Sequence, residues 1–188
     1  MTPKSIIFSS DIDGILSDYP DCFIRYLQVE HNLSYENKEA AKADLKANYR
    51  QYKDLYRNSN FKYQLPYNKD AIEFYKNLSQ QNIPLFFSTS RPFSQYPHMF
   101  DKTKEWLKNS GIEFVDLIQK DIASFKQFKV THHVDDEIKH AEKLSSFECP
   151  WNIFILHRNC ETSNKIAPNF ITVRSFDAII ENLLRRGH

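Results

Sequence analysis

Six short apolar segments along the 188-residue chain have the length and composition of β-strands. They span residues 5–10, 83–88, 113–118, 130–135, 152–157 and 170–174. Most of the stretches between them repeat apolar residues at three- and four-residue spacing, which is typical of amphipathic helices. These helical patterns run through residues 71–78, 103–107, 122–128, 138–144 and 176–184.

Strands that alternate with helices along a chain predict an α/β fold, because a helical crossover joins one parallel strand to the next. We therefore expect a three-layer, doubly wound, Rossmann-like parallel sheet with helices on both faces. The helical pattern at 103–107 ends before Gly111, and glycine is a common stop signal for a helix.

Residues 19–67 interrupt this alternation. They contain no convincing strand pattern, several helix-like stretches and eight of the chain's 10 tyrosines. Within them, residues 40–55 are rich in Ala, Lys and Leu, which are good helix formers. We predict a small helical insertion at 19–67, after the first strand, and a sheet domain made of 1–18 and 68–188.

Composition narrows the range of partners. Lys and Arg number 25 against 24 Asp and Glu, so the net charge of +1 gives no electrostatic case for a nucleic-acid duplex or a membrane as partner. Cys22, Cys149 and Cys160 lack CxxC spacing, so neither a disulfide framework nor a structural zinc site is expected. With no signal-peptide pattern and no apolar stretch long enough to span a bilayer, we expect a soluble, cytoplasmic protein. The sequence does not indicate an oligomeric state.

Polar and charged residues follow the predicted strands at their carboxyl ends. Four groups recur in order: Asp11-Ile12-Asp13-Gly14, Ser88-Thr89-Ser90-Arg91-Pro92, Lys120, and Asp135-Asp136. In open α/β sheets, ligands bind outside the carboxyl ends of the strands. All four groups are therefore expected to converge on one crevice.

Phosphoryl transfer requires these residue types. A carboxylate can attack phosphorus and form an aspartyl-phosphate, provided that a cation such as Mg²⁺ screens its charge from the phosphate. A lysine and a hydroxyl group can stabilise the transferring oxygens. A second carboxyl group can protonate the leaving alcohol and later activate water.

The order DxDG, strand-end Thr, Lys and then DD resembles the haloacid dehalogenase-like (HAD) phosphohydrolases. The resemblance covers about residues 4–18 and 68–186, and the insertion takes the position of that superfamily's C1 cap. The segment 11–18, with Ile15 after the glycine, and the TxRP turn at 89–92 are most similar to the 5'(3')-deoxyribonucleotidases and related bacterial nucleotidases.

The resemblance implies a role for each strand-end residue. Asp11 is expected to be the nucleophile and Asp13 the general acid/base, while Thr89 and Lys120 hold the phosphoryl group. Mg²⁺ is expected to be held by Asp11, the backbone carbonyl of Asp13, and Asp135 or Asp136. Lys126 and Lys129 are alternatives to Lys120. The implied activity is that of a magnesium-dependent phosphomonoesterase acting on a small-molecule phosphate ester, with a nucleoside monophosphate as the first choice. A sugar phosphate suits the same architecture.

Several residues carry two interpretations. Tyr52 belongs to a tyrosine stripe that either packs the insertion's own core or stacks on a nucleobase. Ser90 and Arg91 are candidates for substrate binding. Asp135 and Asp136 can ligate a metal or cap the helix that follows. Among His132 and His133, which alternate across a strand, one is expected to face inward as a core histidine.

Two other functions are alternatives for these residues. Receiver-type phosphoacceptor domains also use Asp, Thr, Lys and magnesium, but they place their paired acids first, whereas this chain places them last. A catalytically silent relative that only binds a partner is the other alternative, and the intact pair of Asp11 and Asp13 argues against it.

Overall fold

The computed structural model describes residues 5–64, 66–145, 151–156 and 169–186. Its centre is a six-stranded, all-parallel sheet with the strand order β3-β2-β1-β4-β5-β6. The strands are β1 (Phe8–Asp11), β2 (Leu85–Thr89), β3 (Asp116–Gln119), β4 (His132–Asp135), β5 (Asn152–Leu156) and β6 (Phe170–Val173). Each strand overlaps a predicted segment, so the predicted parallel α/β sheet is confirmed.

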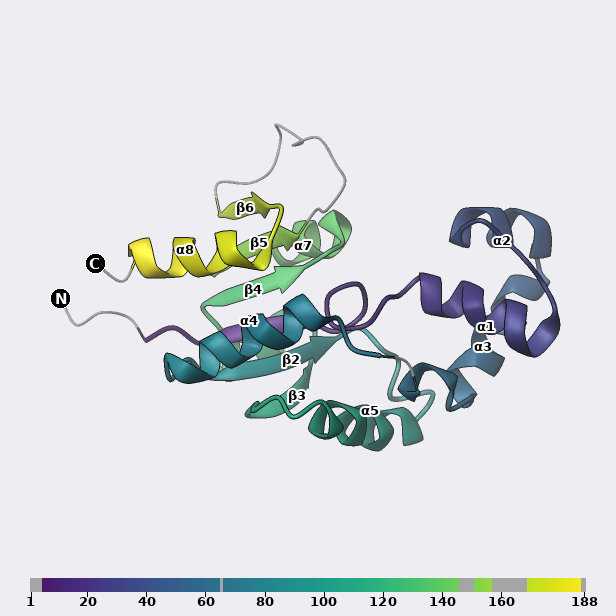
Figure 1. Ribbon diagram of the computed structural model, residues 1–188, viewed down its shortest axis with the longest axis horizontal. Coiled ribbons are helices and arrows are strands. Elements are labelled where there is room, and N and C mark those ends of the chain that lie inside the picture. Colours follow the sequence, from purple (N-terminus) through teal and green to yellow (C-terminus); the bar gives the residue numbers. More distant parts are fainter. Residues whose placement is uncertain (1–4, 65, 146–150, 157–168, 187–188) are drawn as a thin grey trace.

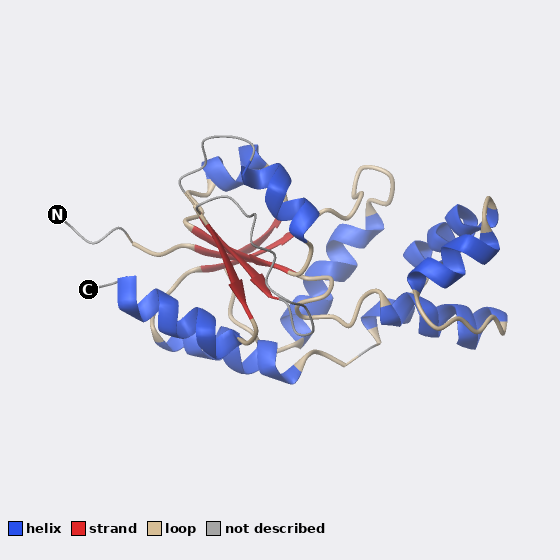
Figure 2. Cartoon of the chain, turned by 90° about the horizontal axis from the view of Figure 1, so that it is seen from above, coloured by secondary structure: helices blue, strands red, loops and turns tan. Residues whose placement is uncertain are grey.

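Helices cover both faces of the sheet, which makes three layers (Figures 1 and 2). One face packs on α4 (Lys69–Gln80), α5 (His98–Asn109) and α8 (Phe176–Arg186). The other packs on α6 (Ile122–Gln127) and α7 (Ile138–Ser145). Alternate strand residues supply the two cores: Leu85 and Phe87 face the first, and Phe86 faces the second.

Because both faces are covered, polar strand residues are buried as well. His133 is 0% exposed, which confirms the predicted core histidine, and His132 is buried as well, at 8% exposed. His133 lies between the Ser9 carbonyl oxygen and Asp135, at 3.2 Å from each, and is a core histidine with polar partners. His132 Nδ1 lies 2.9 Å from Thr131 Oγ1.

The described part of residues 19–67 contains helices joined by loops and no strand. The helices are α1 (Asp21–His31), α2 (Lys38–Leu45), α3 (Asn48–Asn58) and the 3-10 turn η1 (Phe61–Tyr63). Lys46, with φ of 48°, separates α2 from α3 and divides the helix-forming stretch 40–55. Their buried side chains form a third hydrophobic cluster centred on Phe23 and Tyr56. Figure 1 shows these helices beyond the carboxyl ends of the strands.

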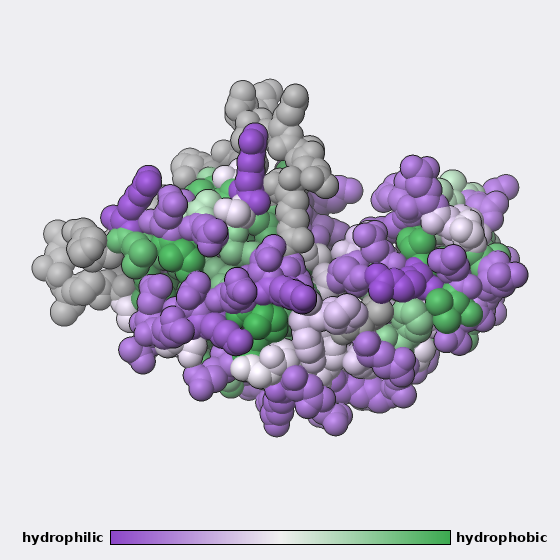
Figure 3. Space-filling view, in the orientation of Figure 1, coloured by the Kyte–Doolittle hydropathy of each residue, from purple (hydrophilic) through white to green (hydrophobic). Residues whose placement is uncertain are grey.

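The surface in the view of Figure 3 is mostly hydrophilic, with small hydrophobic patches. The exposed large hydrophobic residues are dispersed over different elements and loops: Val29, Leu55, Val115 and Leu184. Among the described helices, none has the length and apolar character needed to cross a bilayer.

A buried hydroxyl pair joins α4 to the strand that ends at Asp11. Ser10 Oγ donates to the Asp11 carbonyl oxygen at 2.8 Å and lies 2.6 Å from the Tyr75 hydroxyl. Since the single Ser10 proton is used on Asp11, Tyr75 is the donor to Ser10. This bond fixes β1 against α4 one residue before the candidate site.

Ser10→Ala is expected to lower the free energy of unfolding by about 1–3 kcal/mol, because the buried Tyr75 hydroxyl loses its acceptor. Tyr75→Phe leaves the Ser10 proton paired and is expected to cost less, about 1 kcal/mol. Urea unfolding of both variants measures the difference. A larger loss in Tyr75→Phe than in Ser10→Ala would contradict the donor assignment.

Candidate active site

A cavity of about 280 Å³ lies at the carboxyl ends of the central strands. This volume is near the lower end of the range for small-molecule sites. Its lining residues come from the end of β1 and the loop after it, from the end of β2 and the loop after it, from the loop after β3, from α5, and from the segment that joins β4 to α7 and the start of that helix. Residues 19–67 contribute the others. The lining residues are Asp11, Asp13, Tyr19, Lys53, Tyr56, Arg57, Lys62, Thr89, Ser90, Arg91, Pro92, Met99, Lys120, Asp136, Glu137 and His140.

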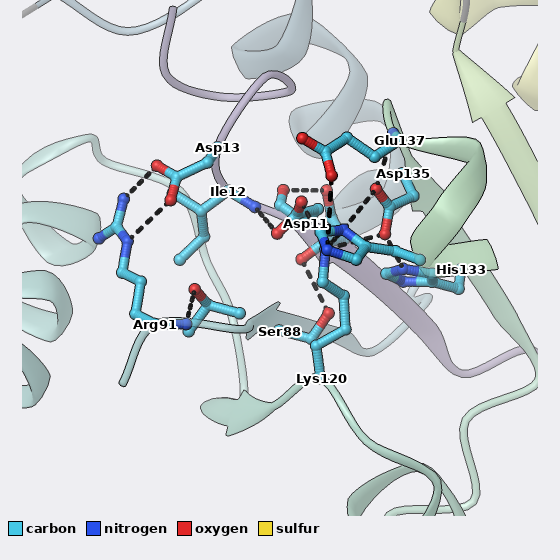
Figure 4. Close-up of polar contacts among 12 residues, drawn as sticks. Asp11, Ile12, Asp13, Ser88, Arg91, Lys120, His133, Asp135 and Glu137 are labelled. Atoms are coloured by element: carbon cyan, nitrogen blue, oxygen red, sulfur yellow. Dashed lines mark hydrogen bonds and ion pairs between the residues drawn. The ribbon is translucent and has the colours of Figure 1, made fainter. Parts of the chain in front are cut away.

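Lys120 lies at the centre of the charged groups (Figure 4). Its Nζ is 2.6 Å from Asp11 Oδ2, 2.9 Å from Asp135 Oδ2 and 3.0 Å from His140 Nδ1. Its backbone N–H donates to the Thr89 carbonyl oxygen at 3.0 Å, which holds the residue beside the end of β2. Although burial disfavours its charge, the two carboxylates outweigh burial and raise the pKa of Lys120. Neither Lys126 nor Lys129 lines the cavity.

Asp11 is the last residue of β1 and is 4% exposed. Its Oδ1 accepts from the Ile12 N–H at 2.8 Å, while Oδ2 faces Lys120. Burial and the charge of Asp135 raise the pKa of Asp11 to about 7, against the opposing effect of Lys120. Hydrogen bonds to both oxygens therefore fix the orientation of the Asp11 carboxyl group, which is shielded from solvent.

Asp13 lies apart from this group and is paired with Arg91. Arg91 donates from Nε to Asp13 Oδ2 at 3.1 Å and from a terminal nitrogen to Oδ1 at 2.5 Å. Ser17 donates to the same carboxylate at 3.1 Å. Burial opposes ionisation, but the charge and hydrogen bonds of Arg91 outweigh it and hold the pKa of Asp13 well below its usual range. In this conformation Asp13 is a carboxylate.

The paired acids after β4 have different surroundings. Asp135 is fully buried and accepts from Lys120 and from the Glu137 N–H at 3.0 Å, next to the start of α7. Asp136 lines the cavity, and its buried Oδ1 has no hydrogen-bond partner among the described residues. Burial, followed by the charge of Asp11, raises the pKa of Asp136 to about 8.

Gly14 allows Asp136 to take this position. The glycine has φ of +85°, and a Cβ on it would lie 1.8 Å from Asp136 Oδ2. Any side chain at this position would therefore be strained and would collide with the second acid. The glycine of the DxDG segment is needed for the close approach of two strand ends.

These acids fit a divalent cation. Asp11, Asp135 and His140 each offer a ligand atom, and these atoms lie within 4.8 Å of one another. The unpartnered Asp136 Oδ1 faces the same region, and carboxylate oxygens are the ligands that Mg²⁺ prefers. His140 was not anticipated from the sequence. Its signal was its place in the first turn of α7, the helix that directly follows the paired acids.

The remaining predicted residues divide into two sets. Thr89, Ser90 and Arg91 line the cavity, and Thr89 Oγ1 accepts from the Arg91 N–H at 3.2 Å. Tyr52 does not line it: its ring makes an edge contact with His31, with ring centroids 4.9 Å apart. A helix advances about 100° per residue, so the neighbouring face of α3 turns to the cavity. That face carries Lys53, Tyr56 and Arg57, which lie three and four residues apart. Lys53 and Tyr56 belong to the same predicted stripe as Tyr52.

The cluster of acids predicts a pH dependence for the metal-free protein. Because folding raises the pKa values of Asp11 and Asp136 above those of an unfolded chain, the folded state holds more protons between about pH 4 and 8. The free energy of unfolding is therefore expected to fall as pH rises through this window, by at most about 1.4 kcal/mol per pH unit for each such proton. Mg²⁺ is expected to raise the melting temperature more at pH 8 than at pH 5.

Thermal unfolding at a series of pH values, with EDTA or with Mg²⁺, measures this effect. Asp136→Asn is expected to flatten the pH dependence in EDTA and to reduce the stabilisation by Mg²⁺. A wild-type protein whose stability rises from pH 5 to pH 8 in EDTA would contradict the assignment.

No family model matches the sequence, and no curated protein matches it either. Solved structures do match. A predicted phosphatase from Clostridium acetobutylicum is 11% identical, with a TM-score of 0.64, over 96% of this chain and 99% of its own. A HAD family hydrolase from Deinococcus radiodurans R1, with bound phosphate and sodium, is 10% identical, with a TM-score of 0.62, over 98% and 97%.

A D,D-heptose 1,7-bisphosphate phosphatase from B. bronchiseptica, complexed with magnesium and phosphate, is 10% identical, with a TM-score of 0.53, over 96% and 98% of the two chains. Because the sequence identities are this low, the similarity to these structures shows a shared fold. The chain has the Rossmann-like fold of the HAD hydrolases, which extends over nearly its whole length.

Proposed function

We propose that this protein is a magnesium-dependent phosphomonoesterase that acts on a small phosphorylated metabolite through a phosphorylated Asp11. The observation that carries the proposal is the placement of Asp11 Oδ2 2.6 Å from Lys120, beside Asp135 and His140, at the carboxyl edge of the sheet. A nucleophile, a cation for the phosphoryl oxygens and a set of metal ligands are thus grouped at one cavity.

In the first step, a carboxylate oxygen of Asp11 attacks phosphorus, and the bond between phosphorus and the ester oxygen breaks. Lys120 and the Thr89 hydroxyl are the groups assigned to the phosphoryl oxygens, where charge develops. Asp11, Asp135, Asp136 and the Asp13 backbone carbonyl would hold Mg²⁺. A bound Mg²⁺ would neutralise charge between the carboxylate and the phosphate.

Asp13 is assigned to proton transfer. As the carboxylate that Arg91 now holds, it suits the second step, in which it takes a proton from the water that attacks the phosphorylated Asp11. Protonating the leaving alcohol in the first step requires a neutral Asp13, and this requires Asp13 to part from Arg91. Arg91 is therefore a positioning residue for the second acid.

Substrate size is limited by the helices of residues 19–67, which we interpret as a cap over the site. A nucleoside monophosphate is the substrate class that the resemblance favours, and Tyr19 and Tyr56 are the aromatic residues at the cavity. A sugar phosphate is the second candidate, because the matching B. bronchiseptica protein is a sugar-bisphosphate phosphatase of the same fold. A cytoplasmic location of the protein remains a prediction from the sequence.

Phosphate release from p-nitrophenyl phosphate, nucleoside monophosphates and sugar phosphates tests the activity. We expect release in Mg²⁺, loss of release in EDTA, and a fall of at least about a thousandfold in Asp11→Asn. Activity that survives in EDTA or in Asp11→Asn would contradict the mechanism. A folded protein that is silent on every ester would favour the binding-only alternative.

Lys120→Met is expected to lower kcat by about a hundredfold to a thousandfold, because one preorganised donor to the phosphoryl group is lost. Lys126→Met is the matched control, since Lys126 is exposed on α6 and does not line the cavity. Steady-state kinetics with p-nitrophenyl phosphate, with circular dichroism as a check on folding, compares the two. Equal activity in both variants would remove Lys120 from the proposed mechanism.

A further inference from the structure

Three cations of the helical insertion line the cavity and have no part in the proposed reaction. Lys53 and Arg57 come from α3, and Lys62 comes from η1. Lys53 donates to the Tyr19 hydroxyl, and no carboxylate of the described chain pairs with it. Arg57 pairs with the partly exposed Asp54 at 3.2 Å and lies over the Tyr96 ring, 5.6 Å from its centroid.

Lys62 is the most informative of the three. It is 8% exposed, so more than nine-tenths of it is buried, and it lines the cavity. Across the described ranges its Nζ has no hydrogen bond or ion pair, and it lies over the Tyr63 ring, 5.3 Å from the ring centroid. The charges of Arg91 and Asp13 reach it, but Asp13 is already bonded twice to Arg91.

The fold holds Lys62 in place from both sides. On one side Phe61 packs edge-on against Tyr26, with centroids 5.6 Å apart, in the hydrophobic cluster of the insertion. On the other side Tyr63 packs against the core of the sheet domain. These two contacts fix the chain on either side of Lys62, which lines the cavity.

A buried ammonium group without a partner destabilises a protein, and an apolar residue would pack there at lower cost. Burial lowers the pKa of Lys62 to about 7, as expected for a cation that lacks a counter-charge. An anion entering the cavity would supply that counter-charge. The geometry thus indicates a ligand group as the missing partner.

In the proposed reaction the transferred phosphoryl group is assigned to Lys120 and Thr89, so Lys62 has no assigned partner. The carboxyl groups at the cavity have other partners or roles. Asp11 faces Lys120, Asp13 faces Arg91 and Glu137 faces His140. Asp136 is assigned to the metal in the proposed reaction. Positive charge therefore remains in excess on the side of the insertion.

We propose that the substrate carries a second anionic group, a carboxylate or a second phosphate, which binds Lys62 and Lys53 with Arg57 beside them. The inference rests on the proposed function and specifies its substrate class. A simple nucleoside monophosphate or sugar monophosphate has no such group and would leave Lys62 without a partner. Sugar bisphosphates, phosphorylated sugar acids and nucleoside bisphosphates have one.

Binding of three esters to Asp11→Asn in Mg²⁺, measured by calorimetry, tests this inference. Glucose 6-phosphate is the reference, 6-phosphogluconate adds a carboxylate, and glucose 1,6-bisphosphate adds a phosphate. At least one of the two charged esters is expected to bind at least about tenfold more tightly than the reference. The one with the larger gain identifies the preferred anion.

Lys62→Met in the same background is expected to remove this gain, and Lys53→Met to reduce it. Lys108→Met, an exposed lysine on α5, is the matched control and is expected to retain it. Because Lys62→Met removes a buried charge, its melting temperature is not expected to fall. Equal binding of all three esters, or a gain that persists in Lys62→Met, would overturn the inference.

The same samples separate this inference from the proposed function. Wild-type protein that releases no phosphate from p-nitrophenyl phosphate, while the charged esters still bind more tightly to Asp11→Asn, would refute the phosphatase and keep the second anion site. Phosphate release by the wild type, with no tighter binding of the charged esters to Asp11→Asn, would keep the phosphatase and refute the second anion site.

Discussion

The ion pairs between Lys120 and the carboxylates of Asp11 and Asp135 are the interaction on which the site depends. All three side chains are nearly or fully buried, and a buried charge without a partner is strongly destabilising. Lys120 follows β3, and in the strand order it reaches across the end of β2 to acids on β1 and β4. One ammonium group therefore joins the ends of strands that are far apart in the sequence.

A second pair, between Asp13 and Arg91, divides the cavity electrostatically. The charges of Arg91 and Asp13 act on Lys62, whereas those of Asp11, Asp135 and Lys120 act on Asp136. The acidic side suits a metal and the transferring phosphoryl group, while the basic side suits another part of the ligand. Because Arg91 also donates to Thr103 on α5 at 2.9 Å, the division is fixed to the sheet domain.

The sequence predicted the sheet because its strands are short apolar runs, and burial of apolar surface on both faces of a parallel sheet requires such runs. It also predicted which strand-end residues meet, because parallel strands present their carboxyl ends at one edge. It did not predict that His132 and His133 are both buried, or that α3 turns Lys53 and Tyr56, instead of Tyr52, toward the cavity. These outcomes depend on how the helices pack over the sheet, and the spacing of apolar residues along the chain does not specify that packing.

By itself, then, the sequence determined the α/β class, the order of the strand-end groups and the chemical type of the site, since these follow from local patterns and from the chemistry of carboxylates, lysine and hydroxyl groups. Only the tertiary structure decided that Lys120 contacts both acids, that Gly14 gives room to Asp136 and that Arg91 holds Asp13. It alone revealed that Lys62 is buried with no ion pair among the described residues, because a missing partner is a property of the space around a side chain.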